Sequence, residues 1–238
     1  MVSDHEWTSI GWLGEARALL SWLHTLDSGP VLLMVRHSER LEDIDVPTTI
    51  QAELTSSGHD LACEFGRRLP VNMKTTIFHS PHIRTRQTAE RIASGLKEKG
   101  GDLLAVEKLD VLLGGRGDIG EIVTLAYEIG FDDFYFRWKR NEIPPEIIEP
   151  IDDYLERLTQ QVVDRFTRAD ANNLHVYVTH DMVIAASRSI YLDISVDRGL
   201  SVPFLGGFSI AKTNDRLVGF NSGDIVSISK DFLLLQDE

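Results

Sequence analysis

The junction between a short apolar stretch and the pair Arg36-His37 constrains the fold more than any other feature of the chain. Residues 31–35 are all apolar and follow Gly29-Pro30, a pattern typical of a buried strand. A buried strand that ends in a cation and an imidazole indicates an anion nearby, because unpaired buried charge is costly. In open α/β sheets, ligands bind beyond the carboxyl ends of the strands. The junction therefore predicts a phosphate site with His37 as nucleophile.

The remaining pattern alternates between strands and helices, which indicates an α/β fold. We expect a three-layer α/β/α sandwich with a mostly parallel sheet and an antiparallel edge hairpin around Asn214-Asp215. The predicted helices are 5–27, about 55–69, about 81–98, about 151–169 and 182–191, and the predicted strands are 31–35, 75–78, 103–109, 174–178, 208–213 and 217–220.

The chain length fits one domain, residues 1–238, with two additions. Residues 1–29 form an N-terminal helical extension. Residues 110–150 begin with several glycines, continue with aromatic residues and end in prolines. We interpret them as an insertion that covers the active site and shapes substrate choice; an ordinary connection between strands is the alternative. The acidic residues 41–53, with Pro47, predict a loop.

The net charge of −13 argues against nucleic acid or an anionic membrane as a partner, because both favour a basic surface. The lone cysteine, Cys63, excludes an internal disulfide and is typical of a reducing compartment. Neither a secretory signal nor a long apolar run is present in the sequence, so a cytoplasmic protein is expected. The sequence does not indicate an oligomeric state.

Three predicted strands end in residues suited to a phosphoryl site. The first ends in Arg36-His37, the second is followed by Ser80 and Arg84, and the fourth by His180-Asp181. Ser80 is the predicted N-cap of the next helix, and Arg84 lies about one turn inside it. A cation there opposes the helix dipole, and a bound anion would remove that conflict. Carboxyl ends of parallel strands share one sheet edge, so we expect these residues to form one site.

These blocks resemble the signature of the histidine phosphatase superfamily, which has the phosphoglycerate-mutase-like fold. The matching segments are residues 36–39, 80–89 and 178–181, and residues 54–58 resemble the Leu-Thr-x-x-Gly helix start of that family. The resemblance covers residues 30 to about 192 in the expected order. It implies a catalytic core of two histidines and two arginines, His37, His180, Arg36 and Arg84.

The chemistry of phosphoryl transfer suits this set, because negative charge spreads over three equatorial oxygens. Guanidinium groups of Arg36 and Arg84 can bind those oxygens bidentately. Neutral His37 would attack to give a phosphohistidine that water hydrolyses, and His180 would serve best when protonated. No metal or other cofactor is expected; a metal site at His37, His180 and Asp181 is the alternative, but the arginines would repel a cation.

The proton donor to the leaving group has several candidates. One branch of the family uses a Glu after the third strand, where this chain has Asp110, with Asp118 as a second possibility. The acid-phosphatase branch uses an Asp after the second His, which matches Asp181, and it carries an Arg that matches Arg40. We favour Asp181. Ser38 replaces the usual Gly of the first block. The candidate substrate-binding residues are Arg40, Ser80 and Arg86.

The sequence thus predicts a phosphomonoester hydrolase with a phosphohistidine intermediate. A phosphoglycerate-type mutase is the first alternative, but the family's mutase blocks are absent after His37 and from residues 107–120. The second alternative is a catalytically weak phosphate-binding or scaffold protein. The expected substrate is a small-molecule or protein phosphomonoester, and its identity is not predicted.

Overall fold

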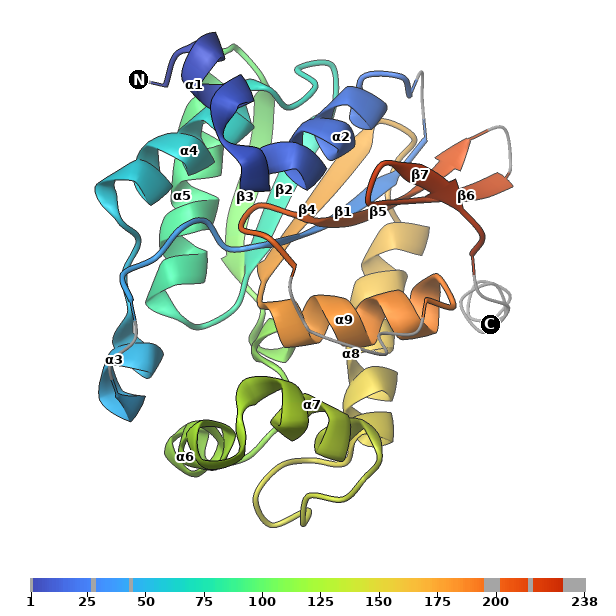
Figure 1. Cartoon of the computed structure of the whole chain (residues 1–238). Coiled ribbons are helices and arrows are strands. Elements are labelled where there is room, and N and C mark those ends of the chain that lie inside the picture. The colour runs from blue at the N-terminus through green and yellow to red at the C-terminus, as the bar shows by residue number, and fades with distance from the viewer. Residues whose placement is uncertain (1, 27–28, 43–44, 195–201, 214–215, 229–238) are drawn as a thin grey trace.

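The computed structural model describes residues 2–26, 29–42, 45–194, 202–213 and 216–228. Within them, seven strands form one sheet in the order β3-β2-β4-β1-β5-β6-β7 (Figure 1). The first four strands of this order are parallel, and β5, β6 and β7 are antiparallel. The strands are β1 (Val31–Arg36), β2 (Lys74–His79), β3 (Asp102–Lys108), β4 (Asn173–Thr179), β5 (Gly207–Thr213), β6 (Arg216–Asn221) and β7 (Asp224–Val226). The mostly parallel α/β sheet is confirmed.

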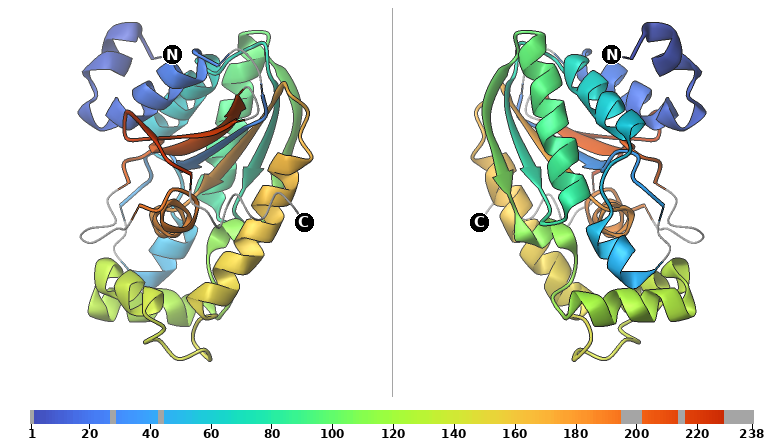
Figure 2. Two further views of the ribbon diagram at one scale, coloured as in Figure 1. Left: turned by 90° about the vertical axis from the view of Figure 1, so that its right-hand side faces the viewer. Right: turned by 90° about the vertical axis from the view of Figure 1, so that its left-hand side faces the viewer.

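Helices cover both faces of the sheet (Figure 2). The α-helices are α1 (Asp4–Ser9), α2 (Gly14–Leu23), α3 (Val46–Gln51), α4 (Ser56–Arg67), α5 (Ile83–Glu98), α6 (Ile119–Ile129), α7 (Phe131–Lys139), α8 (Ile151–Thr167) and α9 (Asp181–Tyr191), and two 3₁₀-helices are η1 (Gly11–Leu13) and η2 (Asp110–Leu113). Within the described ranges, no helix has the length and hydropathy needed to cross a membrane.

Alternate residues of the central strand β1 belong to two apolar cores, one on each face of the sheet. Leu33 packs with α1, α2, α4 and α5, whereas Met34 packs with α6, α7, α8 and α9. Successive side chains of a strand point to opposite faces, so an apolar run predicts burial on both sides. All five apolar residues of β1 are at most 1% exposed. The sheet is therefore the middle layer of the domain.

The structure corrects several element boundaries. The predicted helix 5–27 is broken into α1, η1 and α2, and Ser3 is the N-cap of α1. The predicted loop 41–53 contains helix α3. The expected two-stranded hairpin is extended by β7, which then forms the sheet edge in place of β6. Residue 27, residues 43–44 and the predicted turn at Asn214-Asp215 lie outside the described residues.

Candidate active site

The register of the parallel strands brings the three predicted blocks together. Arg36 of β1 lies opposite Thr179 of β4, so the next residues of the two strands, His37 and His180, are neighbours. Their ring centroids are 5.6 Å apart. Strand β2 pairs with the other side of β4 and ends one residue before Ser80. The sequence-predicted convergence of strand ends is thus present in the fold.

His37 has the geometry of a nucleophile. Its side chain is buried, and Nδ1 lies 2.8 Å from the carbonyl oxygen of Ser38. A carbonyl only accepts, so Nδ1 carries the proton and the lone pair of a neutral ring is on Nε2. Burial, followed by the charges of Arg84 and Arg36, lowers the pKa of His37 well below its ordinary value. The imidazole is therefore neutral at pH 7.

Ser38, the departure from the family pattern, does not face the cavity. Its hydroxyl donates to the carbonyl of Gly58 at 2.8 Å, and its backbone N–H donates to Oγ1 of Thr88 at 3.0 Å. Both groups are buried. The extra hydroxyl thus binds the start of α4 and does not line the cavity.

Arg36 connects the first block to the third. Its Nη2 lies 3.1 Å from a carboxylate oxygen of Asp181, and its Nη1 donates to the carbonyl of Val202 at 2.6 Å. The guanidinium also lies over the ring of Phe204, 4.6 Å from its centroid. Phe204 is a site residue that sequence reasoning missed, since only the tertiary fold brings it beside His37, at a ring separation of 5.7 Å.

Arg84 is held on several sides in the first turn of α5. Its Nη1 donates to the carbonyl of Thr49 and to Nδ1 of His82, both at 2.9 Å. Its Nη2 lies 3.5 Å from Nδ1 of His180. The arginine side chain is only 8% exposed. These contacts fix the guanidinium fork at the end of the pocket that also contains His37.

His180 is engaged at both ring nitrogens. Nδ1 faces the donor Arg84, so the proton is on Nε2, which lies 2.9 Å from the hydroxyl of Ser80. Burial, then the charges of Arg84 and His37, lower the pKa of His180 well below its usual value. The expected protonated His180 does not fit this arrangement, because an imidazolium cannot accept from Arg84. A bound phosphate dianion would oppose the shift by favouring the cation.

The remaining predicted residues separate into those at the pocket and those away from it. Asp181 and Arg40 line the cavity. Asp110 is 73% exposed and pairs with Lys108, and Arg86 is 54% exposed and pairs weakly with Glu90; neither lines the cavity. The alternative acid, Asp118, caps α6 by accepting from the N–H of Glu121.

Ser80 is neither the helix cap nor a lining residue. Helix α5 begins at Ile83, and its N-cap residue is His82. The hydroxyl of Ser80 is fully buried and instead contacts His180 and Thr85, both at 2.9 Å. Through these contacts Ser80 holds one ring nitrogen of His180.

His82 is a third histidine at the site that the sequence analysis did not single out. It lines the cavity, its ring centroid is 5.1 Å from that of His180, and it accepts from Arg84. Burial and the charge of Arg84 lower its pKa to about 4. The neutral ring can therefore accept the hydrogen bond of the guanidinium at pH 7. The sequence signal that could have identified His82 as a site residue is its position two residues before Arg84.

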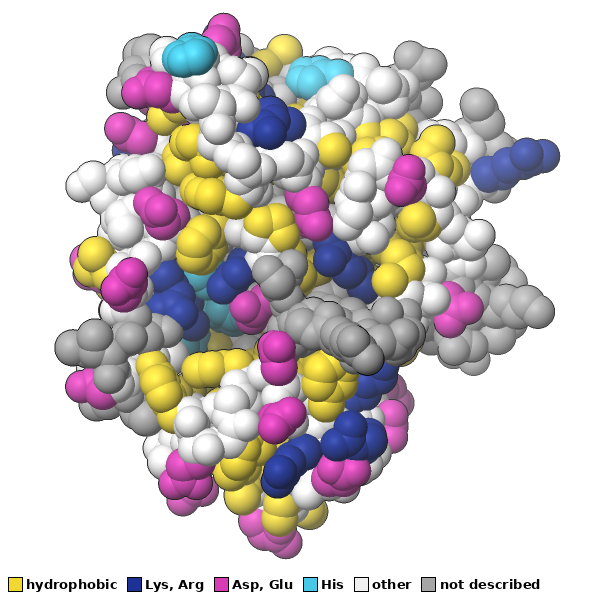
Figure 3. All heavy atoms as spheres, in the orientation of Figure 1, with side chains coloured by type: hydrophobic (Ala, Val, Ile, Leu, Met, Phe, Trp, Pro, Cys, Tyr) yellow, Lys and Arg dark blue, Asp and Glu magenta, His cyan; other side chains and the backbone are white. Residues whose placement is uncertain are grey.

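One cavity of about 480 Å³ contains both the charged cluster and a large apolar wall. Figure 3 shows Arg and His side chains recessed in a hollow on one face, with hydrophobic side chains along its border. Segments 41–53 and 110–150 both contribute to the lining, through Thr49 and through α6 and α7. In the described part of the chain, no group of three His, Cys, Asp or Glu side chains is placed to hold a metal ion.

Comparisons with known proteins agree with this geometry. The family model of the histidine phosphatase superfamily, branch 1, matches residues 32–214. The chain therefore belongs to the histidine phosphatase superfamily, which supports a phosphatase or mutase activity. No curated protein sequence matches it significantly.

Solved structures share the fold at low sequence identity. A phosphoglycerate mutase from Bacillus anthracis str. Sterne is 16% identical with a TM-score of 0.53, over 89% of this chain and 99% of that one. A putative alpha-ribazole-5'-P phosphatase from Escherichia coli is 15% identical with a TM-score of 0.54, over 84% and 100%. A phosphoserine phosphatase from Entamoeba histolytica is 17% identical with a TM-score of 0.51, over 84% and 97%. These likenesses show the phosphoglycerate-mutase-like fold.

Proposed function

We propose that the protein hydrolyses phosphomonoesters through a phosphohistidine on His37. The observation that carries the proposal is the buried, neutral ring of His37, whose Nδ1–H is held by the Ser38 carbonyl. This bond leaves the Nε2 lone pair for attack on phosphorus. The new N–P bond forms as the P–O bond to the leaving group breaks, and that oxygen takes a proton. Water then cleaves the N–P bond and restores His37.

The charged groups around His37 suit the developing transition state. Arg36 and Arg84 would each bind equatorial oxygens of the phosphoryl group, and His180 would donate to it once the phosphate dianion favours the protonated ring. Arg40 lines the same cavity and is a candidate extra phosphate ligand. The charge of Arg40 also contributes to the lowered pKa values of His37 and His82.

Asp181 is the proposed proton donor to the leaving group. It lines the cavity, contacts Arg36 and accepts from the N–H of Met182 at 2.9 Å, whereas Asp110 is exposed and outside the lining. A phosphate dianion bound by Arg36 would place a like charge beside Asp181 and thereby favour the protonated acid. No contact among the described residues favours a mutase or a scaffold over this reaction.

The test is release of inorganic phosphate from p-nitrophenyl phosphate and from 3-phosphoglycerate by wild type and His37→Ala. The proposal predicts phosphate release by wild type and loss of nearly all turnover in the variant. Equal rates in the two proteins would contradict it. Isomerisation of phosphoglycerate without phosphate release would favour the mutase.

A further inference from the structure

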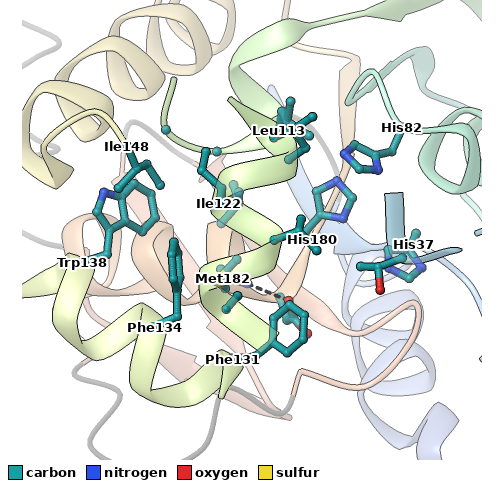
Figure 4. A pocket seen from close by; sticks show the side chains of 18 of the residues that line it. His37, His82, Leu113, Ile122, Phe131, Phe134, Trp138, Ile148, His180 and Met182 are labelled. Atoms are coloured by element: carbon teal, nitrogen blue, oxygen red, sulfur yellow. Dashed lines mark hydrogen bonds between the residues drawn. The ribbon is translucent and has the colours of Figure 1, made fainter. Parts of the chain in front are cut away.

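The cavity has a charged end and an apolar end. In Figure 4 the rings of His37 and His180 lie at one end, and Trp138, Phe134 and Ile148 lie at the other. The cavity volume of about 480 Å³ falls within the range of roughly 300–1,000 Å³ seen for small-molecule sites. If the phosphate occupies the charged end, its leaving group extends along the apolar wall.

The apolar wall presents carbon almost throughout. Its partly exposed side chains are Leu113, Ile119, Phe131 and Met182, and its buried side chains are Ile122, Val123, Ala126, Phe134, Trp138, Ile148 and Val183. The indole N–H of Trp138 donates outward to the carbonyl of Glu149 at 2.8 Å, so its ring offers no donor to the cavity. Apolar groups of a ligand would gain here by leaving water.

The wall is closely packed. Phe134 and Trp138 are at most 2% exposed, so their rings are fixed by the core. Gly115 lines the cavity beside them, and a Cβ at this position would lie 2.8 Å from Cγ1 of Ile148 and 2.9 Å from Cζ2 of Trp138. The lack of a side chain at Gly115 thus allows the loop after η2 to close onto the wall.

Charge along the cavity disfavours a second anionic group on the substrate. Among the described lining residues, the cations are Arg36, Arg40 and Arg84, and all belong to the phosphate end. The carboxylates of Asp132 and Asp181 also line the cavity. Beyond these three arginines, the described lining offers a second carboxylate or phosphate on the leaving group no additional Arg or Lys. Sugar hydroxyls would lose water without gaining partners on the carbon wall.

We propose that the substrates are phosphomonoesters of apolar alcohols, small alkyl or aryl phosphates, in preference to sugar phosphates, phosphoglycerate or phosphoproteins. This inference rests on the proposed function, because it places the phosphate among Arg36, Arg84 and His37. Since one water takes about 30 Å³ of liquid, the cavity holds roughly 16 water-sized groups. A phosphate uses about five of them, which leaves room for roughly ten more non-hydrogen atoms.

Binding of n-alkylphosphonates tests the substrate class without requiring turnover. The head group is constant in the series, so only buried apolar surface changes. Calorimetry should show that affinity rises about fourfold per methylene, or about 60-fold from propyl- to hexylphosphonate. Affinities within twofold of each other would overturn the proposal.

Substitutions in the apolar wall test whether this wall is where the alkyl chain binds. Phe131 is 40% exposed and lines the cavity, whereas Leu104 is 54% exposed and lies on β3 outside the lining. Phe131→Ala should reduce the gain from propyl to hexyl several-fold, and Leu104→Ala should retain it. Ile119→Ala, at a second partly exposed lining residue, should also reduce the gain from propyl to hexyl. If both Phe131→Ala and Ile119→Ala keep the wild-type preference for hexylphosphonate, the apolar wall does not bind the alkyl chain and the assignment is overturned.

A matched pair of esters separates this inference from the proposed hydrolysis. Cyclohexylmethyl phosphate and glucose 6-phosphate have rings of equal size and differ mainly in hydroxyl groups. We expect kcat/KM to be at least about 10-fold higher for the cyclohexyl ester. Equal turnover of both would uphold the hydrolase and overturn the substrate class. If the enzyme hydrolyses neither ester but phosphonate affinity still rises with chain length, the inference of an apolar ligand is upheld and the proposed hydrolysis is contradicted.

Discussion

The guanidinium of Arg36 lies 3.1 Å from the carboxylate of Asp181, so the residue before His37 is paired with the residue after His180. The pair exists because β1 and β4 are parallel neighbours with Arg36 opposite Thr179. It joins a candidate phosphate ligand to the candidate acid. Substrate phosphate would compete with Asp181 for Arg36, which couples phosphate binding to release of the carboxyl group toward the leaving oxygen.

The acid role of Asp181 predicts a dependence on the leaving group. Asp181→Asn should lower kcat strongly for alkyl phosphates, whose alkoxide needs a proton, and much less for p-nitrophenyl phosphate. A difference of about 10²-fold between the two losses matches general acid catalysis. Initial rates with both esters provide the measurement. Asp110→Asn is the control and should match wild type; equal losses for both esters in Asp181→Asn would exclude the acid role.

His82 is predicted to position Arg84 by accepting its hydrogen bond. His82→Leu removes the acceptor and should weaken inhibition by inorganic phosphate about 10-fold, since hydrogen bonds to charged groups contribute about 1.5–3 kcal/mol. His82→Gln supplies an amide oxygen and should restore most of the affinity. Inhibition constants for the three proteins give the comparison. Full phosphate affinity in His82→Leu would show that Arg84 needs no such partner.

The pKa of His37 can be followed directly by NMR of the histidine ring carbons. Burial and the charges of Arg84 and Arg36 disfavour the imidazolium, so the ring should remain neutral as the pH falls through the ordinary value of about 6.5. Arg36→Met removes one of those cations, and the titration of His37 should move to higher pH. A wild-type midpoint at or above about 6.5 would refute a neutral nucleophile set by its surroundings.

His175 predicts how stability depends on pH. It is buried in β4 beside Phe78, and burial lowers its pKa to about 4. Below about pH 6.5 the unfolded chain binds a proton at His175 that the folded protein does not. The free energy of unfolding should therefore fall by about 1.4 kcal/mol per pH unit from this group until pH reaches about 4.

Urea unfolding at pH 7 and pH 5 isolates this contribution. Between pH 7 and pH 5 the free energy of unfolding of wild type should fall by about 2 kcal/mol more than that of His175→Phe. The variant lacks the imidazole that binds a proton in the unfolded chain. His175→Gln serves as a second variant if Phe packs poorly against Tyr177. Equal pH-dependent losses in wild type and both variants would show that His175 is not held neutral.

The fold was predictable where local pattern and burial agree. The apolar run Val31–Val35 predicted strand β1, and the polar residues that follow it predicted the site. The family resemblance predicted the order of the three sequence blocks that form the site. The break between α1 and α2 was not predictable, because the apolar spacing continues through it. The guanidinium of Arg17 donates to the carbonyls of Trp7 and Ile10, at 3.0 and 2.9 Å, and so satisfies groups at the end of α1.

The site residues that the sequence did not predict are brought to the site by contacts between segments far apart in the sequence. Phe204 lies beside Arg36 because the next two residues bond to it: the N–H of Leu205 donates to the Arg36 carbonyl, and the N–H of Arg36 donates to the carbonyl of Gly206. Thr49 reaches Arg84 because α3 borders the cavity. The same fold explains why Ser80 binds His180 instead of capping α5. No spacing along the chain encodes these distances.

Trapping the phosphorylated enzyme tests the central claim most directly. Wild type should be mixed with excess aryl phosphate, quenched rapidly in alkali and digested, and the phosphopeptides should be mapped by mass spectrometry. We predict an acid-labile, alkali-stable phosphate on the peptide that contains His37, absent from His37→Ala and retained in Asp110→Asn. Turnover by wild type with phosphate on another residue, or an equal yield from His37→Ala, would contradict nucleophilic attack by His37.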